Sequence, residues 1–178
     1  MSETPQATYH VWRSQILELT AQQPRTGGIA ELRHWFGRAS LNPMTGKRHS
    51  LRGADLHSWY VRSWRRPRYL LTPHMTHLSI RAASDSGAFV RIRVLPFAAA
   101  RPLVGADRGS GADVLAYTGP PAPATVTVSN AAIWFADPDG TNFRLLTKCD
   151  GPYEGPVQLP GGPGLLAIET SGRWSVEL

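Results

Sequence analysis

The segment HSWYVRSWRRPRYLL, residues 57–71, places four arginines and four aromatic rings within fifteen residues. Aromatic faces can stack on unpaired bases and arginines can bind phosphates, so these residue types suit single-stranded nucleic acid. Tyr60 and Trp64 are also four residues apart, which would put both rings on the packed face of a helix. The arginines would then extend outward and could meet an acidic protein surface. The sequence leaves these three interpretations open.

The cations that we expect to contact a partner or nucleic acid lie in this segment and in the turn-rich basic loop LNPMTGKRHS that precedes it. They are Arg62, Arg65, Arg66, Arg68, Lys47 and Arg48.

Two groups of residues resemble metal sites but lack a full ligand set. Asp137, Asp139 and Asn142 follow the oxygen-ligand spacing of a calcium loop, but Lys148 stands where that loop needs a bidentate carboxylate. Asp-Gly between two apolar runs is also a hairpin signal. The histidines of PHMTH, three residues apart in an extended segment, point to opposite faces. We therefore expect no metal and no other cofactor.

No residue stands in an activating context for catalysis. Gly46 and Lys47 lack the rest of a phosphate-binding loop, because Leu41 occupies the first glycine position and Arg48 the magnesium-binding Ser or Thr position. Cys149 precedes an aspartate, whose charge disfavours the thiolate. No Gly-x-Ser-x-Gly elbow occurs. We expect that the protein is not an enzyme.

The charge is unevenly distributed along the 178 residues, whose net charge is +6. Residues 1–70 hold 11 Lys or Arg against 4 Asp or Glu, residues 71–102 hold 4 against 1, and residues 103–178 hold 4 against 8. A basic first half suits acidic protein surfaces or phosphates. We expect protein subunits with an acidic surface as partners, with nucleic acid as the alternative.

The N-terminus, MSETPQATYH, has no basic segment followed by an apolar run, and no window approaches 18 consecutive apolar residues. We expect no signal peptide, no membrane span, and a location in the cytoplasm or in a particle assembled there. The single cysteine provides no disulfide framework, so packing must stabilise the fold.

The spacing of apolar residues predicts short helices before Pro67 and strands after Pro73. Three helices are expected at about residues 9–24, 29–36 and 54–66, on the spacing of Tyr9, Trp12, Ile16 and Leu19, of Ile29, Leu32 and Phe36, and of Leu56, Tyr60 and Trp64. Residues 1–72 would thus form a basic, Trp-rich helical segment with a disordered arm.

Residues 73–178 would form an antiparallel β-sandwich or jelly roll, because apolar and polar residues alternate over short segments between Gly- and Pro-rich turns. The strands expected from residue 114 onward cover 114–117, 124–129, 131–136, 143–148, 157–159, 165–169 and 173–178, while 98–112 would be a loop. One core is expected from Val90, Ile92, Val94, Val126, Val128, Ile133, Phe143, Leu145, Leu166, Ile168, Trp174 and Val176. The fold class is therefore mainly β, preceded by a short helical segment.

Residues 119–178 contain a strand, a hairpin, a GPYEG corner, a Gly-rich turn and a closing strand with Trp174. In this order they resemble the CUB-like and pre-peptidase C-terminal β-sandwich modules of bacteria and phages. The resemblance implies a binding or architectural role without a fixed active site. The calcium ligands of CUB domains have no residue-by-residue match here.

We therefore expect a non-enzymatic structural or interaction protein that is oligomeric and forms an accessory component of a large assembly, such as a phage capsid or tail. The alternatives are a nucleic-acid-binding protein that uses residues 57–71, and a carbohydrate-binding β-sandwich that uses Trp134 and Tyr153 as stacking platforms.

Overall fold

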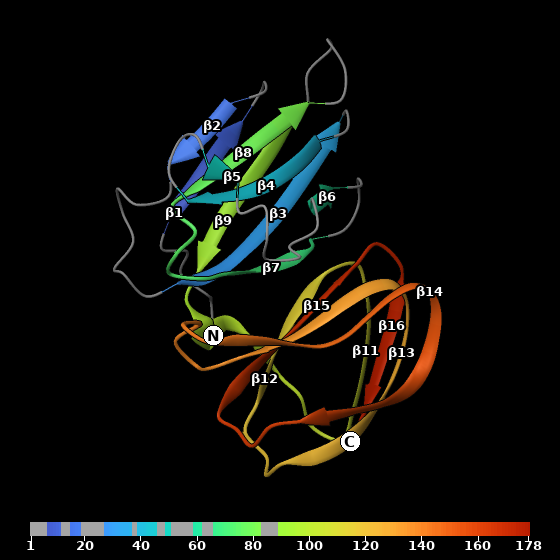
Figure 1. The fold of residues 1–178 in the computed structure, drawn as a ribbon. Helices are drawn as coiled ribbons and strands as arrows, with labels where there is room; N and C mark the ends of the chain where they lie inside the picture. Colours follow the sequence, from blue (N-terminus) through green and yellow to red (C-terminus); the bar gives the residue numbers. More distant parts are fainter. Residues whose placement is uncertain are drawn as a thin grey trace. The chain divides into compact units, whose positions relative to one another are not determined.

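The computed structural model describes residues 7–11, 15–18, 27–36, 39–45, 49–50, 59–61, 66–82 and 89–178 (Figure 1). The chain divides into two compact units, residues 1–67 with 71–96 and residues 68–70 with 97–178. Apart from one turn of 3-10 helix, η1 (Phe97–Ala99), the regular elements of the described residues are strands. The protein is mainly β, as the alternating pattern predicted.

The first unit contains two small antiparallel sheets. One has the order β1–β9–β3, and the other the order β2–β8–β4–β5 with β6 also paired to β4. The strands are β1 (Ala7–Val11), β2 (Gln15–Glu18), β3 (Gly28–Phe36), β4 (Ala39–Thr45), β5 (His49–Ser50), β6 (Trp59–Val61), β8 (His77–Ala82) and β9 (Phe89–Leu95).

The helices predicted at residues 9–24 and 29–36 are wrong where the structure describes them, because β1, β2 and β3 occupy these positions. In β3, Ile29, Ala30, Glu31 and Leu32 are all buried, so burial on both faces hides the alternation of a strand. Pairing with β9 supplies the hydrogen-bond partners of β3 from about sixty residues further along the chain. No local pattern reveals such a partner.

Of the third predicted helix, residues 59–61 form β6 and Arg66 is described outside any strand, while the remaining residues, including Trp64, lie outside the described part of the chain.

The second unit is built on strands that pair in the order β10–β12–β15–β13–β16–β11, with β14 paired to β13 as well. The strands are β10 (Arg101–Pro102), β11 (Ala106–Ser110), β12 (Asp113–Tyr117), β13 (Ala122–Ala136), β14 (Phe143–Leu159), β15 (Gly164–Thr170) and β16 (Arg173–Glu177), while β7 (Arg68–Leu71) spans the division between the units.

The long hairpin of β13 and β14 organises this unit (Figure 1). Asn130, with a φ of 48°, interrupts β13 at a bulge between Ser129 and Ala131. Before the bulge β13 pairs with β16, and after it β13 pairs with β15. Since a bulge bends its strand, the sheet curls around one core.

Two segments of this hairpin that the sequence predicts as breaks between strands therefore belong to the strands themselves. The predicted strands 124–129 and 131–136 are one bent strand, and 143–148 and 157–159 are the two ends of β14. The expected GPYEG corner lies in the middle of β14. Pro152 and Pro156 fit there because β14 pairs with β13 alone among the described strands, so a missing N–H on its outer edge costs no ladder bond.

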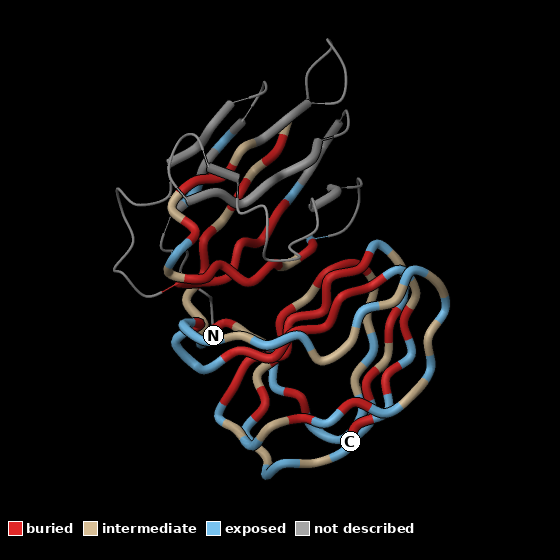
Figure 2. The backbone as a smooth tube through the Cα atoms, viewed as in Figure 1, coloured by how far each residue is buried: buried red, intermediate tan, exposed pale blue. Residues whose placement is uncertain are grey.

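Burial separates the predicted core into two groups. Val126, Val128, Ile133, Leu166, Ile168, Trp174 and Val176 belong to one cluster in the second unit, whereas Val90, Ile92 and Val94 are buried in the first unit. Phe143 is half-buried and Leu145 is 40% exposed, so these two are not core residues. Figure 2 shows β15 buried along its whole length.

An ion-pair network links the two ends of the strand order in the second unit. The Arg101 guanidinium on β10 lies 3.1 Å from Asp107 on β11 and 2.8 Å from Asp113 on β12. Burial lowers the pKa of Arg101, but the hydrogen bonds and charges of Asp113 and Asp107 outweigh it, and the net shift is upward. The region predicted as a loop, residues 98–112, thus contains the two strands that bring the sheet edges together.

The unit boundary also differs from the sequence-based division at residues 72 and 73, because β8 and most of β9 pair within the first unit. Residues 68–70 belong to the second unit. The Arg68 backbone N–H donates to the Ala112 carbonyl at 2.9 Å, and its guanidinium donates to the Ala99 carbonyl at 3.1 Å.

Replacing Ile133, which is fully buried in the second core, by Ala should lower the free energy of unfolding of that unit by about 2–5 kcal/mol, because it leaves a cavity. Leu145→Ala on the same hairpin should cost less than about 1 kcal/mol, because Leu145 is exposed. Urea unfolding measures both. Equal losses would contradict the placement of the core.

Tyr69 should make the second unit sensitive to alkali. Burial, and then the charge of Glu169, raise the pKa of its hydroxyl above the ordinary 10.0. The fold thus favours the neutral phenol, and this stabilisation is complete below pH 10 and is lost as the pH rises above it. Between about pH 9 and 11, Tyr69→Phe should lose less stability than the wild type in urea unfolding. An equal loss of unfolding free energy with rising pH in both proteins would contradict this.

Candidate functional site

Of the six predicted binding cations, the structure describes Arg66 and Arg68. Lys47, Arg48, Arg62 and Arg65 lie outside the described residues. Arg66 is exposed just before β7. Arg68 is half-buried and holds the Ala99 carbonyl, so its side chain has a structural role.

A different set of cations forms a row across the first unit. The register places His10 on β1 opposite Arg91 on β9, and Arg91 opposite Arg33 on β3. Side chains directly opposite each other in a sheet project to the same face with their Cβ atoms about 5 Å apart. His10 and Arg33 are exposed and Arg91 is half-buried. We call His10, Arg91 and Arg33 the cationic row.

The neighbouring row on this face is partly neutralised. Thr8, Arg93 and Glu31 lie opposite one another on the same three strands. The Arg93 guanidinium donates to the buried Glu31 carboxylate at 2.9 Å. The Arg93–Glu31 ion pair thus lies directly beside the cationic row.

The sequence predicts Val90, Ile92 and Val94 as core residues, which leaves Arg91 and Arg93 for the other face of β9. The row could not be predicted, because the residues of β1 and β3 were expected to form helices and the neighbours of Arg91 were therefore unknown.

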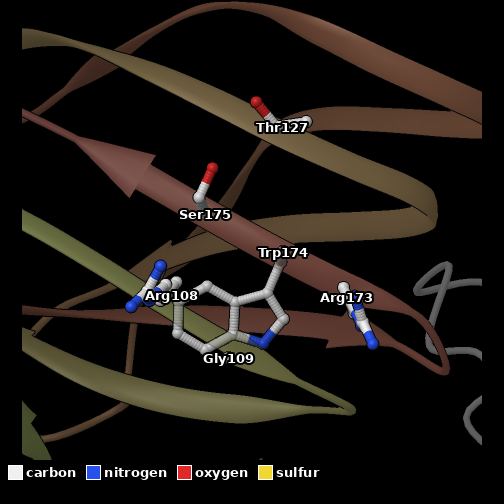
Figure 3. A pocket seen from close by; sticks show the side chains of 6 residues that line it. All are labelled: Arg108, Gly109, Thr127, Arg173, Trp174 and Ser175. Carbon is white, nitrogen blue, oxygen red and sulfur yellow. The ribbon is translucent and has the colours of Figure 1, made fainter.

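A second cationic feature is a hollow of about 330 Å³ in the second unit (Figure 3). Thr127 on β13, Ser175 on β16 and Arg108 on β11 lie opposite one another, with Arg173 two residues before Ser175. Arg108, Thr127 and Arg173 are exposed, and Ser175 is half-buried. We call this site, lined also by Gly109 and Trp174, the arginine hollow.

The buried side of the arginine hollow is fixed by Trp174. Its indole is 3% exposed and donates to the Gly111 carbonyl at 2.9 Å. Gly109 lies opposite Trp174, and a Cβ there would clash with the indole ring. Only glycine therefore lets β11 approach the indole this closely.

Neither metal candidate forms a cluster of ligands. In the 137–142 turn, the Asp139 carboxylate accepts hydrogen bonds from the Thr141 backbone and hydroxyl, which lower its pKa, and Asp137 accepts one from Asn142. His77 is buried with its Nδ1 2.9 Å from the Thr76 hydroxyl, while His74 is exposed. Within the described ranges, no three His, Cys, Asp or Glu residues come together as a metal site.

The two proposed carbohydrate platforms are engaged within the fold. Trp134 is 7% exposed, and its ring meets Phe143 edge-on at 5.7 Å. Tyr153 is half-buried, and its hydroxyl donates to the Pro156 carbonyl at 3.1 Å. The buried face of Trp134 cannot stack on a sugar.

Comparisons with known proteins identify no family. No family model and no curated protein matches the chain. Among solved structures, it is similar to the stem and receptor binding domain of the spike protein P1 from bacteriophage PM2, with 12% identity and a TM-score of 0.27 over 99% of this chain and 79% of that chain. A TM-score this low carries no inference about function. In the described part of the chain, no helix is long and apolar enough to span a membrane.

Adding millimolar Ca²⁺ or EDTA should leave the melting temperature unchanged, because the carboxylates of the 137–142 turn already accept hydrogen bonds from their neighbours. Thermal unfolding followed by circular dichroism tests this. A rise of several degrees with Ca²⁺ that is lost in Asp139→Asn would identify the turn as a calcium site.

Proposed function

We propose that this chain is a non-enzymatic interaction protein that docks on an acidic protein surface through the cationic row, as an accessory, oligomeric component of a large assembly such as a phage particle. The observation that carries the proposal is the placement of His10, Arg91 and Arg33 side by side on three neighbouring strands. The Arg91 and Arg33 guanidiniums lie on directly opposite positions of neighbouring strands, and an acidic surface would complement them.

The net charges of the two units support binding of an acidic partner by the first unit. The first unit holds 13 Lys or Arg against 5 Asp or Glu, a net charge of +8, and the second holds 6 against 8, a net charge of −2. An acidic partner would therefore be attracted to the first unit. Long-range attraction of this kind accelerates association and orients the encounter.

The geometry favours a folded partner over a nucleic-acid strand. The row belongs to a regular sheet, and the described rings near it, His10 and Phe89, pack edge-on at 5.8 Å. Sequence-tolerant binding of single strands needs exposed ring faces for stacking. In the predicted platform of residues 57–71, residues 57–58 and 62–65 lie outside the described residues and Tyr69 is buried, so nucleic acid is the competing outcome of the test.

The resemblance of residues 119–178 to CUB-like and pre-peptidase C-terminal modules stays a prediction. It would give the second unit a binding or architectural role within the same assembly.

The proposal is tested with poly-L-glutamate as the acidic surface and a single-stranded oligothymidylate as the competing ligand. The wild type should bind poly-L-glutamate in a salt-dependent way. Arg33→Gln combined with Arg91→Gln should weaken this binding about tenfold at low salt, since each exposed charge contributes up to about 1 kcal/mol. Fluorescence anisotropy measures both affinities.

The matched control is Arg144→Gln, an exposed arginine on β14, which should leave the affinity unchanged. Equal melting temperatures would show that the variants fold. If Arg62, Arg65 and Arg66 changed together to Gln abolish binding while the row variant binds normally, the surface is the sequence-predicted segment. Tighter binding of oligothymidylate than of poly-L-glutamate would replace the proposal by nucleic-acid binding.

A further inference from the structure

We propose that the arginine hollow of the second unit binds a carboxylated sugar, that is, a hydroxylated ring of monosaccharide size that carries one carboxylate. The site is separate from the cationic row, because it is built by β11, β13 and β16 of the second unit. It needs no exposed aromatic ring, unlike the stacking platforms predicted from the sequence.

Two guanidiniums are placed to bind one carboxylate. Arg108 lies opposite Ser175, and Arg173 lies two residues away on the same strand, so the arginines are diagonal neighbours on one face. Diagonal neighbours in an antiparallel pair are about 7–8 Å apart, within reach of long side chains. Figure 3 shows Arg108 and Arg173 on opposite sides of the Trp174 indole. A planar guanidinium matches a carboxylate with two parallel hydrogen bonds.

The fold does not use these two charges internally. Among the described residues, neither Arg108 nor Arg173 forms an ion pair, although Glu177 lies on the same face of β16. By contrast, Arg101 is held by two aspartates and Arg68 by a carbonyl. In a unit with a net charge of −2, the hollow is thus a local positive site.

The remaining lining fits the hydroxyl groups of a sugar. Ser175 and Thr127 each present a hydroxyl, which can donate one hydrogen bond and accept others. Ring hydroxyls have the same dual character, whereas a bare oxyanion only accepts. A volume of about 330 Å³ is in the range of small-ligand sites and exceeds what a single oxyanion fills.

The site is rigid before binding. Arg173, Ser175 and Arg108 lie on paired strands, and Trp174 between the first two is locked by its hydrogen bond to Gly111. Little side-chain and loop ordering is then needed beyond the arginine rotamers, which favours binding of a small ligand.

The test is calorimetric titration of the full chain with D-glucuronate, D-glucose, acetate and inorganic phosphate. Glucuronate should bind saturably, and glucose and acetate at least about tenfold more weakly, because each lacks one half of the interaction. Arg108→Gln and Arg173→Gln should each weaken glucuronate binding about tenfold. Ser175→Ala should weaken glucuronate more than acetate, since it removes a contact to the ring.

The matched control is again Arg144→Gln, which removes one exposed charge from the same unit and should leave glucuronate binding unchanged. Arg173→Lys keeps the charge but removes the planar fork, and it should retain only part of the affinity, so the test does not depend on one variant folding. Phosphate or acetate bound as tightly as glucuronate would overturn the sugar assignment. Glucuronate bound equally by the wild type and the Arg108/Arg173 double variant would overturn the site.

The outcome is independent of the proposed docking function. Arg33→Gln with Arg91→Gln should leave glucuronate binding intact, and the arginine-hollow variants should leave poly-L-glutamate binding within about twofold. Loss of both activities in either variant would mean that the two sites are not separate, and would overturn the inference.

Discussion

The pairing of β13 with β14 is the constraint on which the second unit depends. The two strands pair along almost their whole length, and the bulge at Asn130 bends them into two halves. One half of β13 pairs with β15 and the other half pairs with β16. The hairpin thus forms one side of the core and also positions the strands that complete the core. The Arg101 network then joins β10, β11 and β12 at the far ends of the strand order. A straight β13 would give a flat sheet, with no enclosed core and no fixed neighbour for Trp174.

In the first unit, β9 has the corresponding role. Its apolar residues Val90, Ile92 and Val94 are fully buried, and its arginines project from the other face. β1 and β3 pair with β9 on either side. Residues that face outward on β9 therefore lie beside outward-facing residues of β1 and β3. The hydrophobic effect fixes which side chains point inward. The cationic row lies on the outward face, beside the ion pair of Arg93 with Glu31.

The two cationic features differ in the shape of ligand that they suit. The row is a line of charges on a sheet face, which fits an extended acidic surface and would depend strongly on salt. The arginine hollow combines two charges with two hydroxyls around a small volume, which fits one compact ligand and depends on hydrogen-bond geometry. A protein with both features could be held in an assembly by one unit and contact a small ligand with the other.

The sequence alone was enough to predict the mainly β class, most strand positions after residue 113 except the middle of β14, seven of the fifteen residues of the second core, and the uneven charge. Period-two alternation is a local signal, and it is clear wherever one face of a strand is wet, as in β9, the first half of β13 and β16. Tertiary structure decided the rest. Where both faces of a strand are buried, as at residues 28–32 of β3, no alternation is visible, and the spacing of Ile29, Leu32 and Phe36 predicted a helix instead. Both cationic sites join residues from three strands, including Arg33 with Arg91 and Arg108 with Arg173. Strand register creates these neighbours, and register is set by packing and long-range pairing between segments that no local pattern connects.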